Sequence, residues 1–383
     1  MATLTSPLTS PLSGAKRIVI KIGSSLLVDQ ETGELKAEWL NALVSDITHL
    51  KARGQDVVIV SSGAIALGRR VLNFKPGTLR LEEDQAAASV GQVDLAHAYR
   101  EALARKNLVA AQILVTLGDT EERRRYLNAR NTIATLLRLG AVPVINENDT
   151  VATSEIRVGD NDRLAARVAS MISADCLVLL SNVTGLYTSS PDTDDAAEVL
   201  AQVKQITPEI DAMVSGKISN MGKGGMATKI AAARIAMAAG MHMAIADGRQ
   251  SNPLKAIEKD SLCTWFLPSA TPVAARKKWI AGSLEPRGQI TIDEGAAIAL
   301  SSGKSLLPAG IIKVTGTFGR GDAVSVISAQ GVEFARGLSA YGAGDAHLIM
   351  GHKSSDIEKI LGYRGRTEMI HRDDLVLTKG SGT

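Results

Sequence analysis

The feature that most constrains the fold is an alternation between short apolar runs and longer amphipathic segments. The apolar runs are rich in Val and Ile, end in Gly, Ser or Asn, and cover residues 17–23, 56–63, 108–116, 142–148, 176–182 and 242–248. Each run has the length of a buried strand. Strands that alternate with helices favour parallel pairing through right-handed crossovers. We therefore predict a three-layer α/β/α sandwich with a mainly parallel sheet over residues 15–270.

Helical periodicity and capping signals fill the intervals between these runs. Apolar residues recur every three or four positions across 38–53, and Gly54 follows as a left-handed cap. Asp119 and Glu122 resemble a capping box that opens a helix running to Leu139. An Ala-rich helix over 228–239 is closed by a glycine. The acidic segment 188–205 is expected to be a surface loop or hairpin outside the core.

The chain changes character near residue 270. Aromatic residues make up only 3% of the sequence, so the core of the first domain must be aliphatic. Pro and Gly punctuate a predicted linker over 271–284. Beyond it, short β-like pieces at 289–292, 310–314, 323–327 and 375–377 predict a small, mainly β domain over 285–376. Residues 1–14 are rich in Pro, Ser and Thr and are expected to form a disordered tail.

Charge and cysteine content narrow the class of protein. A net charge of +3 is too small to indicate a nucleic-acid or membrane surface. Cys176 and Cys263 stand in apolar surroundings without metal-ligand spacing, which is typical of buried reduced thiols. No apolar run approaches the roughly 18 residues of a membrane helix. We expect a cytoplasmic protein.

Gly, hydroxyl, amide and carboxylate groups gather where the predicted strands end. Ligands of open parallel sheets bind beyond the carboxyl ends of the strands, and glycines let backbone N–H groups approach an anion. The sequence lacks a complete Walker A motif, and no GxGxxG follows a strand. A glycine cluster over 222–229 precedes a helix and is either a phosphate loop or an ordinary turn.

Two lysines stand out at this edge. Lys21 lies inside an apolar strand, and Lys229 opens a helix, where a cation is unfavourable unless an anion is near. Two cations directed at one site suit phosphoryl transfer, in which charge spreads over the moving PO₃ group. Asp149, Asp160 and Asp162 lie among the asparagines of the same edge. They are either helix caps or groups that bind an ammonium or a metal, or that orient the lysines.

The motifs in this order resemble the glutamate 5-kinase family of the amino-acid kinase superfamily, in its long form with a C-terminal PUA domain. The resemblance runs from about residue 16 to 372. It is carried by VIKIGSS (19–25), VSSGAIALGR (60–69), AASVGQ (87–92), YLNAR (126–130), PVINENDTVAT (143–153), VGDND (158–162), GLYT (185–188), GGMATK (224–229), RKKWI (276–280), DEGA (293–296), SLLP (305–308) and HRDD (371–374). PVINEND together with VGDND separates this family from its kinase relatives.

The resemblance implies a role for each matching residue. Lys21 and Lys229 would contact the transferring phosphoryl group, and Asp162 would orient both lysines. Ser62, Asp149 and Asn161 would bind glutamate. The nucleotide would be contacted by Lys21, Ser181, Asn182, Lys223, Gly224, Gly225, Met226, Ala227, Thr228 and Lys229.

The resemblance also implies partners. ATP would enter with Mg²⁺, and no metal site made by the protein alone is implied. The product, γ-glutamyl phosphate, would pass to glutamate-5-semialdehyde dehydrogenase as proline synthesis begins. Feedback inhibition by proline and a homodimer or homotetramer are further expectations.

Two departures and two alternatives remain at this stage. Asn182 replaces a common Asp, and Lys223 replaces a common Thr, so the details of nucleotide contact are open. N-acetylglutamate, aspartate, carbamate or UMP are alternative phosphate acceptors. PUA domains also occur in RNA-modifying enzymes, but residues 285–383 hold 11 Lys and Arg against 11 Asp and Glu. A net charge of zero argues against RNA binding.

Overall fold

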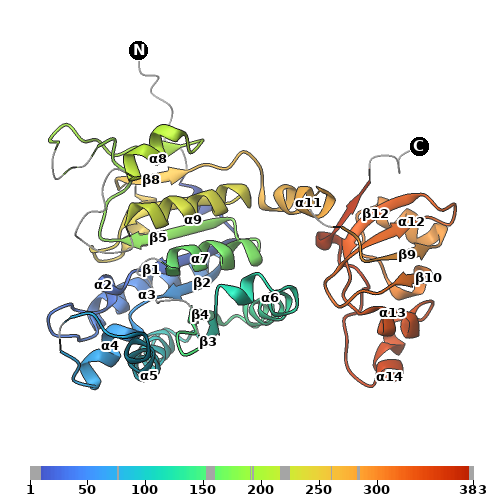
Figure 1. Cartoon of the computed structure of the whole chain (residues 1–383), viewed down its shortest axis with the longest axis horizontal. Coiled ribbons are helices and arrows are strands. Elements are labelled where there is room, and N and C mark those ends of the chain that lie inside the picture. The colour runs from blue at the N-terminus through green and yellow to red at the C-terminus, as the bar shows by residue number, and fades with distance from the viewer. Residues whose placement is uncertain are drawn as a thin grey trace, which may run out of the picture. The chain divides into compact units, whose positions relative to one another are not determined.

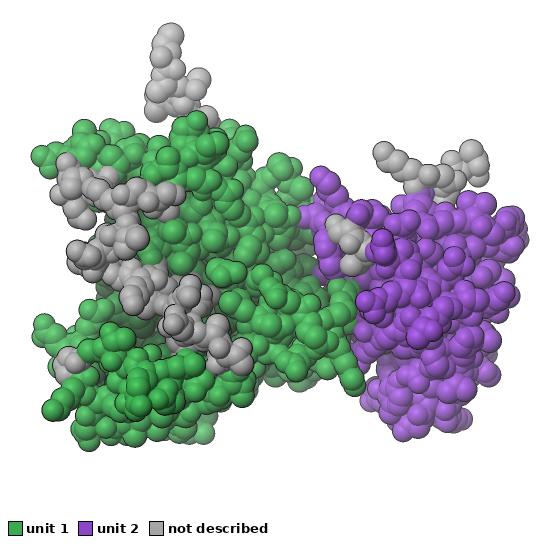
Figure 2. Space-filling view, viewed as in Figure 1, with its two compact units in different colours: residues 1–272 green, residues 273–383 purple. Residues whose placement is uncertain are grey.

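The computed structural model describes residues 10–75, 77–151, 160–189, 191, 194–215, 225–259, 261–282 and 285–378. The chain divides into two compact units, residues 1–272 and 273–383, which are coloured green and purple in Figure 2. The segment 271–284, predicted as a linker, contains helix α11 (Pro272–Gly282). Within the described ranges, no helix combines the length and apolarity needed to cross a bilayer.

The first unit is built on one eight-stranded sheet (Figure 1). Its strands are β1 (Arg17–Ile22), β2 (Asp56–Ser61), β3 (Ala110–Val115), β4 (Val142–Glu147), β5 (Cys176–Ser181), β6 (Gln202–Val203), β7 (His242–Asp247) and β8 (Cys263–Phe266). They lie in the order β3-β4-β2-β1-β5-β7-β8-β6. All neighbours pair in parallel except β7 and β8, which are antiparallel. The six predicted strands and the mainly parallel sheet are confirmed.

Helices join these strands. They are α1 (Pro11–Gly14), α2 (Ser24–Leu27), α3 (Ala37–Ala52), α4 (Ala64–Val71), α5 (Leu81–Ala104), α6 (Arg123–Arg138), α7 (Asp160–Met171), α8 (Pro208–Ser215), α9 (Met226–Ala238) and α10 (Pro253–Glu258). The predicted helix over 38–53 is α3, and Gly54 follows it with φ +77°. A glycine pays no Cβ penalty in this left-handed conformation, so it ends the helix.

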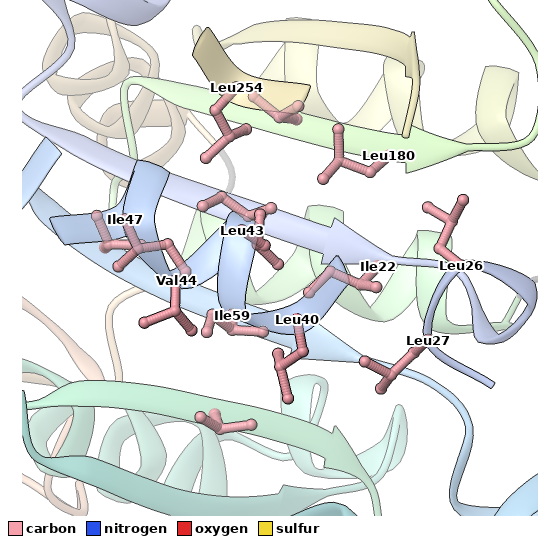
Figure 3. Packing of buried hydrophobic residues seen from close by; sticks show 14 of the residues in the cluster. Ile22, Leu26, Leu27, Leu40, Leu43, Val44, Ile47, Ile59, Leu180 and Leu254 are labelled. Carbon is pink, nitrogen blue, oxygen red and sulfur yellow. The ribbon is translucent and has the colours of Figure 1, made fainter. Parts of the chain in front are cut away.

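Two hydrophobic layers cover the two faces of the sheet. Successive side chains of a strand point to opposite faces. Ile18, Ile20 and Ile22 of β1 accordingly pack with α3, α5 and α10, as part of the cluster drawn in Figure 3. Val19 packs instead with residues of α6, α7 and α9. Lys21 shares the face of Val19, so the alternation of β1 directs this lysine toward α7 and α9.

The helix predicted from a capping box begins in a different way. The helix is α6, and its N-cap is Glu122, whose carboxylate accepts hydrogen bonds from the N–H groups of Arg124 (3.0 Å) and Arg125 (3.2 Å). Asp119 lies one turn earlier, in the 3₁₀ turn η1 (Gly118–Thr120). It accepts from the N–H (2.7 Å) and hydroxyl (2.8 Å) of Thr116. Asp119 therefore closes the preceding turn, and the predicted capping box is wrong.

The acidic insert is partly a hairpin and partly core. Tyr187 and Val199 form an antiparallel bridge, as a hairpin requires. The end of the insert, β6, pairs in parallel with β8 and so extends the main sheet, and Val203 is 4% exposed. The expectation that residues 188–205 lie outside the core is therefore wrong at this end. Strand β8, the partner of β6, has four residues and was too short to show an alternating pattern.

The end of the segment predicted as a disordered tail is ordered. Residues 1–9 lie outside the described residues. Helix α1 follows them, and its Leu12 is fully buried. The buried side chain of Gln55 donates to the carbonyl oxygens of Leu12 (3.0 Å) and Ala15 (2.6 Å). Burial of one leucine and two hydrogen bonds thus holds this segment against the first unit.

The second unit contains a five-stranded mixed sheet and its own hydrophobic core. Its elements are β9 (Gly288–Ile292), α12 (Glu294–Ser301), η2 (Pro308–Gly310), β10 (Ile311–Gly316), β11 (Ala323–Ile327), β12 (Glu333–Leu338), α13 (Ala343–Ile349), η3 (Ser354–Asp356), α14 (Ile357–Leu361), η4 (Arg372–Asp374) and β13 (Leu375–Leu377). The four predicted β pieces are β9, β10, β11 and β13. Strand β12 was not predicted. The mainly β character of this unit is confirmed.

Candidate active site

The polar residues singled out from the sequence follow strands whose carboxyl ends share one edge of the sheet. β1, β2, β4 and β5 run in parallel as neighbours, and Ile22 of β1 is in register with Ser61 of β2 and Leu180 of β5. Ser62 and Ser181 therefore stand beside the end of β1. The edge faces the first turns of α7 and α9, and the positive end of a helix dipole favours an anion.

At this edge Asp162 holds two lysines at once. Oδ1 of Asp162 lies 2.6 Å from Nζ of Lys21, and Oδ2 lies 3.3 Å from Nζ of Lys229. The hydroxyl of Thr228 donates to Oδ2 at 3.1 Å. Asp162 is 1% exposed, Lys21 7% and Lys229 8%. Strand β1 and the first turns of α7 and α9 thus bring together the two lysines that the sequence placed 208 positions apart.

Burial and charge act in opposite directions on this cluster. Burial alone would raise the pKa of Asp162, but the charges and hydrogen bonds of Lys21 and Lys229 hold it below its ordinary value. Burial lowers the pKa of Lys21, the ion pair with Asp162 opposes that shift, and the charge of Lys229 adds to it. One carboxylate faces two ammonium groups, so the cluster carries an excess positive charge in a buried environment with little access to water. Such an arrangement attracts an anion.

A second cluster consists of side-chain amides and hydroxyls. Nδ2 of Asn161 lies within hydrogen-bonding distance of the Ser61 carbonyl (3.2 Å), the Ser62 hydroxyl (2.8 Å) and Oδ1 of Asn146 (3.2 Å). Nδ2 of Asn146 donates to Oε1 of Gln92 at 2.8 Å. Oδ1 of Asn161 is buried and has no hydrogen-bond partner among the described residues. Asn161 and Ser62, both predicted as substrate residues, are therefore in direct contact.

Asp149 is the third predicted substrate residue, and it lies on the turn after β4. It is 9% exposed. Burial raises its pKa to about 6, with a further contribution from the negative charge of Asp84. Asp84 lies in the first turn of α5. A buried carboxylate of this kind is stabilised by an incoming cation, such as an ammonium group.

The predicted nucleotide residues lie at the start of α9 and the end of β5. Gly225 is the N-cap of α9, followed by Met226, Ala227 and Thr228 in its first turn. The Ser181 hydroxyl contacts Oδ1 of the exposed Asn182 at 3.4 Å. Lys223 and Gly224 lie outside the described residues, as do residues 158 and 159 of the VGDND motif, and the side chain of Asp160 is likewise not described.

Sequence reasoning gave no role to three residues that the structure brings to this edge: Gln92, Asp84 and Tyr99. The Tyr99 hydroxyl lies 2.9 Å from the hydroxyl of Ser61, and the side chain is fully buried. All three lie on α5. Gln92 is the last residue of the AASVGQ motif, and this motif could have indicated its role at the site. No sequence motif indicated a role for Asp84 or Tyr99, because the residues they contact are distant in sequence.

No group of three or more His, Cys, Asp or Glu side chains that could hold a metal ion occurs in the described part of the chain. Both oxygens of Asp162 face lysines, so its carboxylate has no geometry for a divalent ion in this arrangement. Mg²⁺ keeps several waters and commonly binds through substrate phosphates.

Comparison with known proteins agrees with the two-unit organisation. A sequence model of the amino acid kinase family matches residues 16–247, and one of the PUA domain matches residues 288–361. Glutamate 5-kinase of Agrobacterium fabrum is 61% identical over 368 residues, covering 96% of this chain and 94% of that protein. Glutamate 5-kinase of Paramagnetospirillum magneticum is 59% identical, covering 96% and 99%.

A solved structure of carbamate kinase from Giardia lamblia bound to AMP-PNP covers 67% of this chain and 100% of that chain, at 18% identity and a TM-score of 0.48. The relatives at about 60% identity decide the assignment, since they match nearly the whole length of both chains. The chain belongs to the glutamate 5-kinase family, within the amino acid kinases that carry a C-terminal PUA domain.

Proposed function

We propose that this chain transfers the γ-phosphoryl group of ATP to the side-chain carboxylate of free L-glutamate, the first step of proline synthesis. The observation that carries the proposal is the pair of buried lysines on Asp162, beside the Asn161–Ser62 contact. The first suits a migrating phosphoryl group, and the second suits a polar amino acid. Membership of the family supports the choice of ATP and glutamate.

The acceptor needs no general base. A glutamate side chain has a pKa of about 4.3, so it is ionised at neutral pH and can attack phosphorus directly. A carboxylate oxygen forms the new P–O bond, the bond between γ-phosphorus and its bridging oxygen breaks, and ADP leaves. The products are ADP and γ-glutamyl phosphate. The work of the protein is to position the reactants and to neutralise charge.

Lys21 and Lys229 neutralise that charge. Each ammonium has three N–H groups and directs one of them at Asp162, so the other two can face the phosphoryl oxygens. Asp162 fixes both side chains and is a positioning residue in this scheme. Mg²⁺, carried by the phosphates of ATP, supplies further charge neutralisation when bound. The N-terminus of α9, at Gly225, Met226 and Ala227, would receive the phosphates on backbone N–H groups at the positive end of the helix dipole.

Ser62, Asn161 and Asp149 would hold glutamate. The ammonium of glutamate is a cation, and Asp149 is a buried carboxylate without a hydrogen bond or ion pair from any described residue. An acceptor without an ammonium, such as N-acetylglutamate or UMP, would leave this charge uncompensated. Carbamate also carries no ammonium, so the same argument disfavours it.

The test is glutamate-dependent formation of ADP, with hydroxylamine added to trap the acyl phosphate as a hydroxamate. We expect turnover with ATP and L-glutamate, and hydroxamate in equal amount to ADP. Aspartate, N-acetylglutamate, carbamate and UMP serve as comparison acceptors. Faster turnover with any of them than with glutamate would contradict the proposal.

Assembly, regulation and location extend the proposal. We propose that the protein forms a homodimer or homotetramer and that proline inhibits it. We also propose that it passes its product to glutamate-5-semialdehyde dehydrogenase and that it is located in the cytoplasm. We also propose kinase, linker and PUA-like boundaries at 15–270, 271–284 and 285–376. Adding proline to the same assay, and measuring mass by light scattering, test the first two points.

A further inference from the structure

A relay of side-chain amides connects helix α5 to the substrate side of the site. Gln92 of α5 accepts from Nδ2 of Asn146 at 2.8 Å, and Oδ1 of Asn146 lies 3.2 Å from Nδ2 of Asn161. Nδ2 of Asn161 also faces the Ser61 carbonyl (3.2 Å) and the Ser62 hydroxyl (2.8 Å). The relay therefore joins three elements, α5, β4 and α7, at the carboxyl edge of the sheet.

Each contact of the relay has a direction. The Ser61 carbonyl can only accept, so the nitrogen of the Asn161 amide must face it, and Oδ1 of Asn161 turns the other way. Oδ1 is buried there, and no residue that the structure describes donates to it. A buried acceptor without a donor is unfavourable, so the surroundings of Asn161 set the orientation of its amide even though Oδ1 is left unsatisfied.

Asn146 needs a separate constraint. It is 3% exposed, so neither end of its amide can turn toward bulk water. If its amide rotated by half a turn, its nitrogen would face the nitrogen of Asn161, and two donors would oppose each other. The hydrogen bond to Oε1 of Gln92 is the contact that holds the nitrogen of Asn146 away from Asn161.

The unpartnered oxygen of Asn161 restricts what can bind. At neutral pH both carboxylates of glutamate are ionised and carry no hydrogen, so its ammonium is its only hydrogen-bond donor. An acceptor aimed at bound glutamate can therefore be satisfied only by the ammonium or by water.

We propose that Gln92 is a positioning residue for substrate selection: through Asn146 it fixes the amide of Asn161, so that Oδ1 of Asn161 accepts from the substrate ammonium. This inference rests on the proposed function and assigns the atom that distinguishes an amino acid from a plain dicarboxylate. Gln92 touches no reacting atom, so its effect falls on binding of glutamate rather than on phosphoryl transfer.

The experiment compares Gln92→Met with Gln92→Glu. Met removes the acceptor at similar length, whereas Glu retains an acceptor in either orientation. Gln112→Met, at an exposed position of β3, is the matched control. Glutarate, which is glutamate without the amino group, serves as a competitive inhibitor because its affinity does not depend on an ammonium.

For Gln92→Met we expect the KM for glutamate to rise about tenfold, the effect of losing about 1.4 kcal/mol of binding. The KM for ATP, kcat and the Ki of glutarate should stay within about twofold. Gln92→Glu should return the KM for glutamate to within about threefold of the wild-type value, and Gln112→Met should leave all constants unchanged.

Two outcomes would overturn the relay: an unchanged KM for glutamate in Gln92→Met, or an equal loss of affinity for glutamate and glutarate. The second would mean that Gln92 only shapes the pocket. Thermal unfolding shows whether Gln92→Met is folded, and Gln92→Ala replaces it if it is not. If the wild-type protein shows no glutamate-dependent turnover, the proposed function itself is refuted. This outcome is distinguishable from a failure of the relay, which appears only in the Gln92 variants.

Discussion

Gly68 of α4 and Gly91 of α5 lie against each other where the two helices cross. A Cβ atom added to Gly68 would stand 1.8 Å from the carbonyl oxygen of Ala87, and one added to Gly91 would stand 1.9 Å from that of Ala64. No side chain fits at such distances, so the helices touch backbone to backbone. Because α4 begins two residues after Ser62 and Gln92 follows Gly91, this crossing positions both ends of the amide cluster.

The glycine crossing predicts a large effect from one methyl group. Gly91→Ala should force the helices apart and lower the free energy of unfolding by about 2 kcal/mol or more. Gly14→Ala, where an added Cβ meets nothing within 4 Å, should change it by less than about 0.5 kcal/mol. Urea unfolding of the two variants checks this. Equal stability of the two variants would show that α4 and α5 can separate without cost.

Asp162 should be more important for stability than any surface carboxylate. Asp162→Asn leaves Lys21 and Lys229 buried without a counter-charge, and breaking a buried pair in this way costs about 3–5 kcal/mol. Because the pKa of Asp162 is held below its ordinary 3.8, this contribution is complete at neutral pH and is lost as the pH falls through that lowered pKa.

The control for Asp162 is Glu82→Gln, which removes an exposed ion pair with Arg80 (3.2 Å). Exposed pairs contribute about 0–1 kcal/mol, so this variant should unfold like the wild type. Urea unfolding at pH 7 measures both. A loss of stability in Asp162→Asn no greater than in Glu82→Gln would argue against a buried charge cluster.

Lys229 should affect the chemical step. Lys229→Met removes one of the two cations beside the moving phosphoryl group, and kcat should fall about 10²–10³-fold, as for the loss of other preorganised charge-stabilising donors. Lys106→Met, at an exposed position of the turn that follows α5, should retain wild-type kcat. Steady-state kinetics at saturating ATP and glutamate provide the test, and near-normal turnover in Lys229→Met would remove Lys229 from the site.

The raised pKa of Asp149 predicts that kcat/KM for glutamate depends on pH. Its pKa is raised to about 6, so below this pH the group is protonated and no longer attracts an ammonium. The value of kcat/KM for glutamate should fall about tenfold per pH unit below that point. Asp84→Asn should move the inflection to lower pH, since the charge of Asp84 contributes to the shift. An inflection that stays in place in Asp149→Asn would assign it to another group.

The same raised pKa has a consequence for stability. The folded protein binds the Asp149 proton more tightly than the unfolded chain, so ionised Asp149 destabilises the fold at neutral pH. Asp149→Asn should therefore raise the melting temperature at pH 7 while it raises the KM for glutamate. A lower melting temperature in this variant would show that Asp149 has a stabilising partner in the free protein.

The positions of the strands could be predicted from the sequence more reliably than the residues at which helices begin. The run at residues 142–148 combined length, Val and Ile content and a polar end, and three independent signals agreed on β4. The helix start near residue 120 rested on one short motif, and the competing turn at Asp119 used the same residue types. Strands β8 and β12 were missed because four to six residues with mixed burial show no clear alternation.

The sequence by itself determined which groups stand at the carboxyl edge of the sheet, because parallel strands must end there together. It also determined that Lys21 lies in an apolar strand and that the motifs, in their order, match one enzyme family. Only the tertiary structure decided that Asp162 meets both lysines and that Gln92 on α5 reaches Asn146. Hydrogen bonds between side chains depend on helix positions to within about an ångström. Such positions follow from packing such as the Gly68–Gly91 crossing, which no local pattern in the chain reveals.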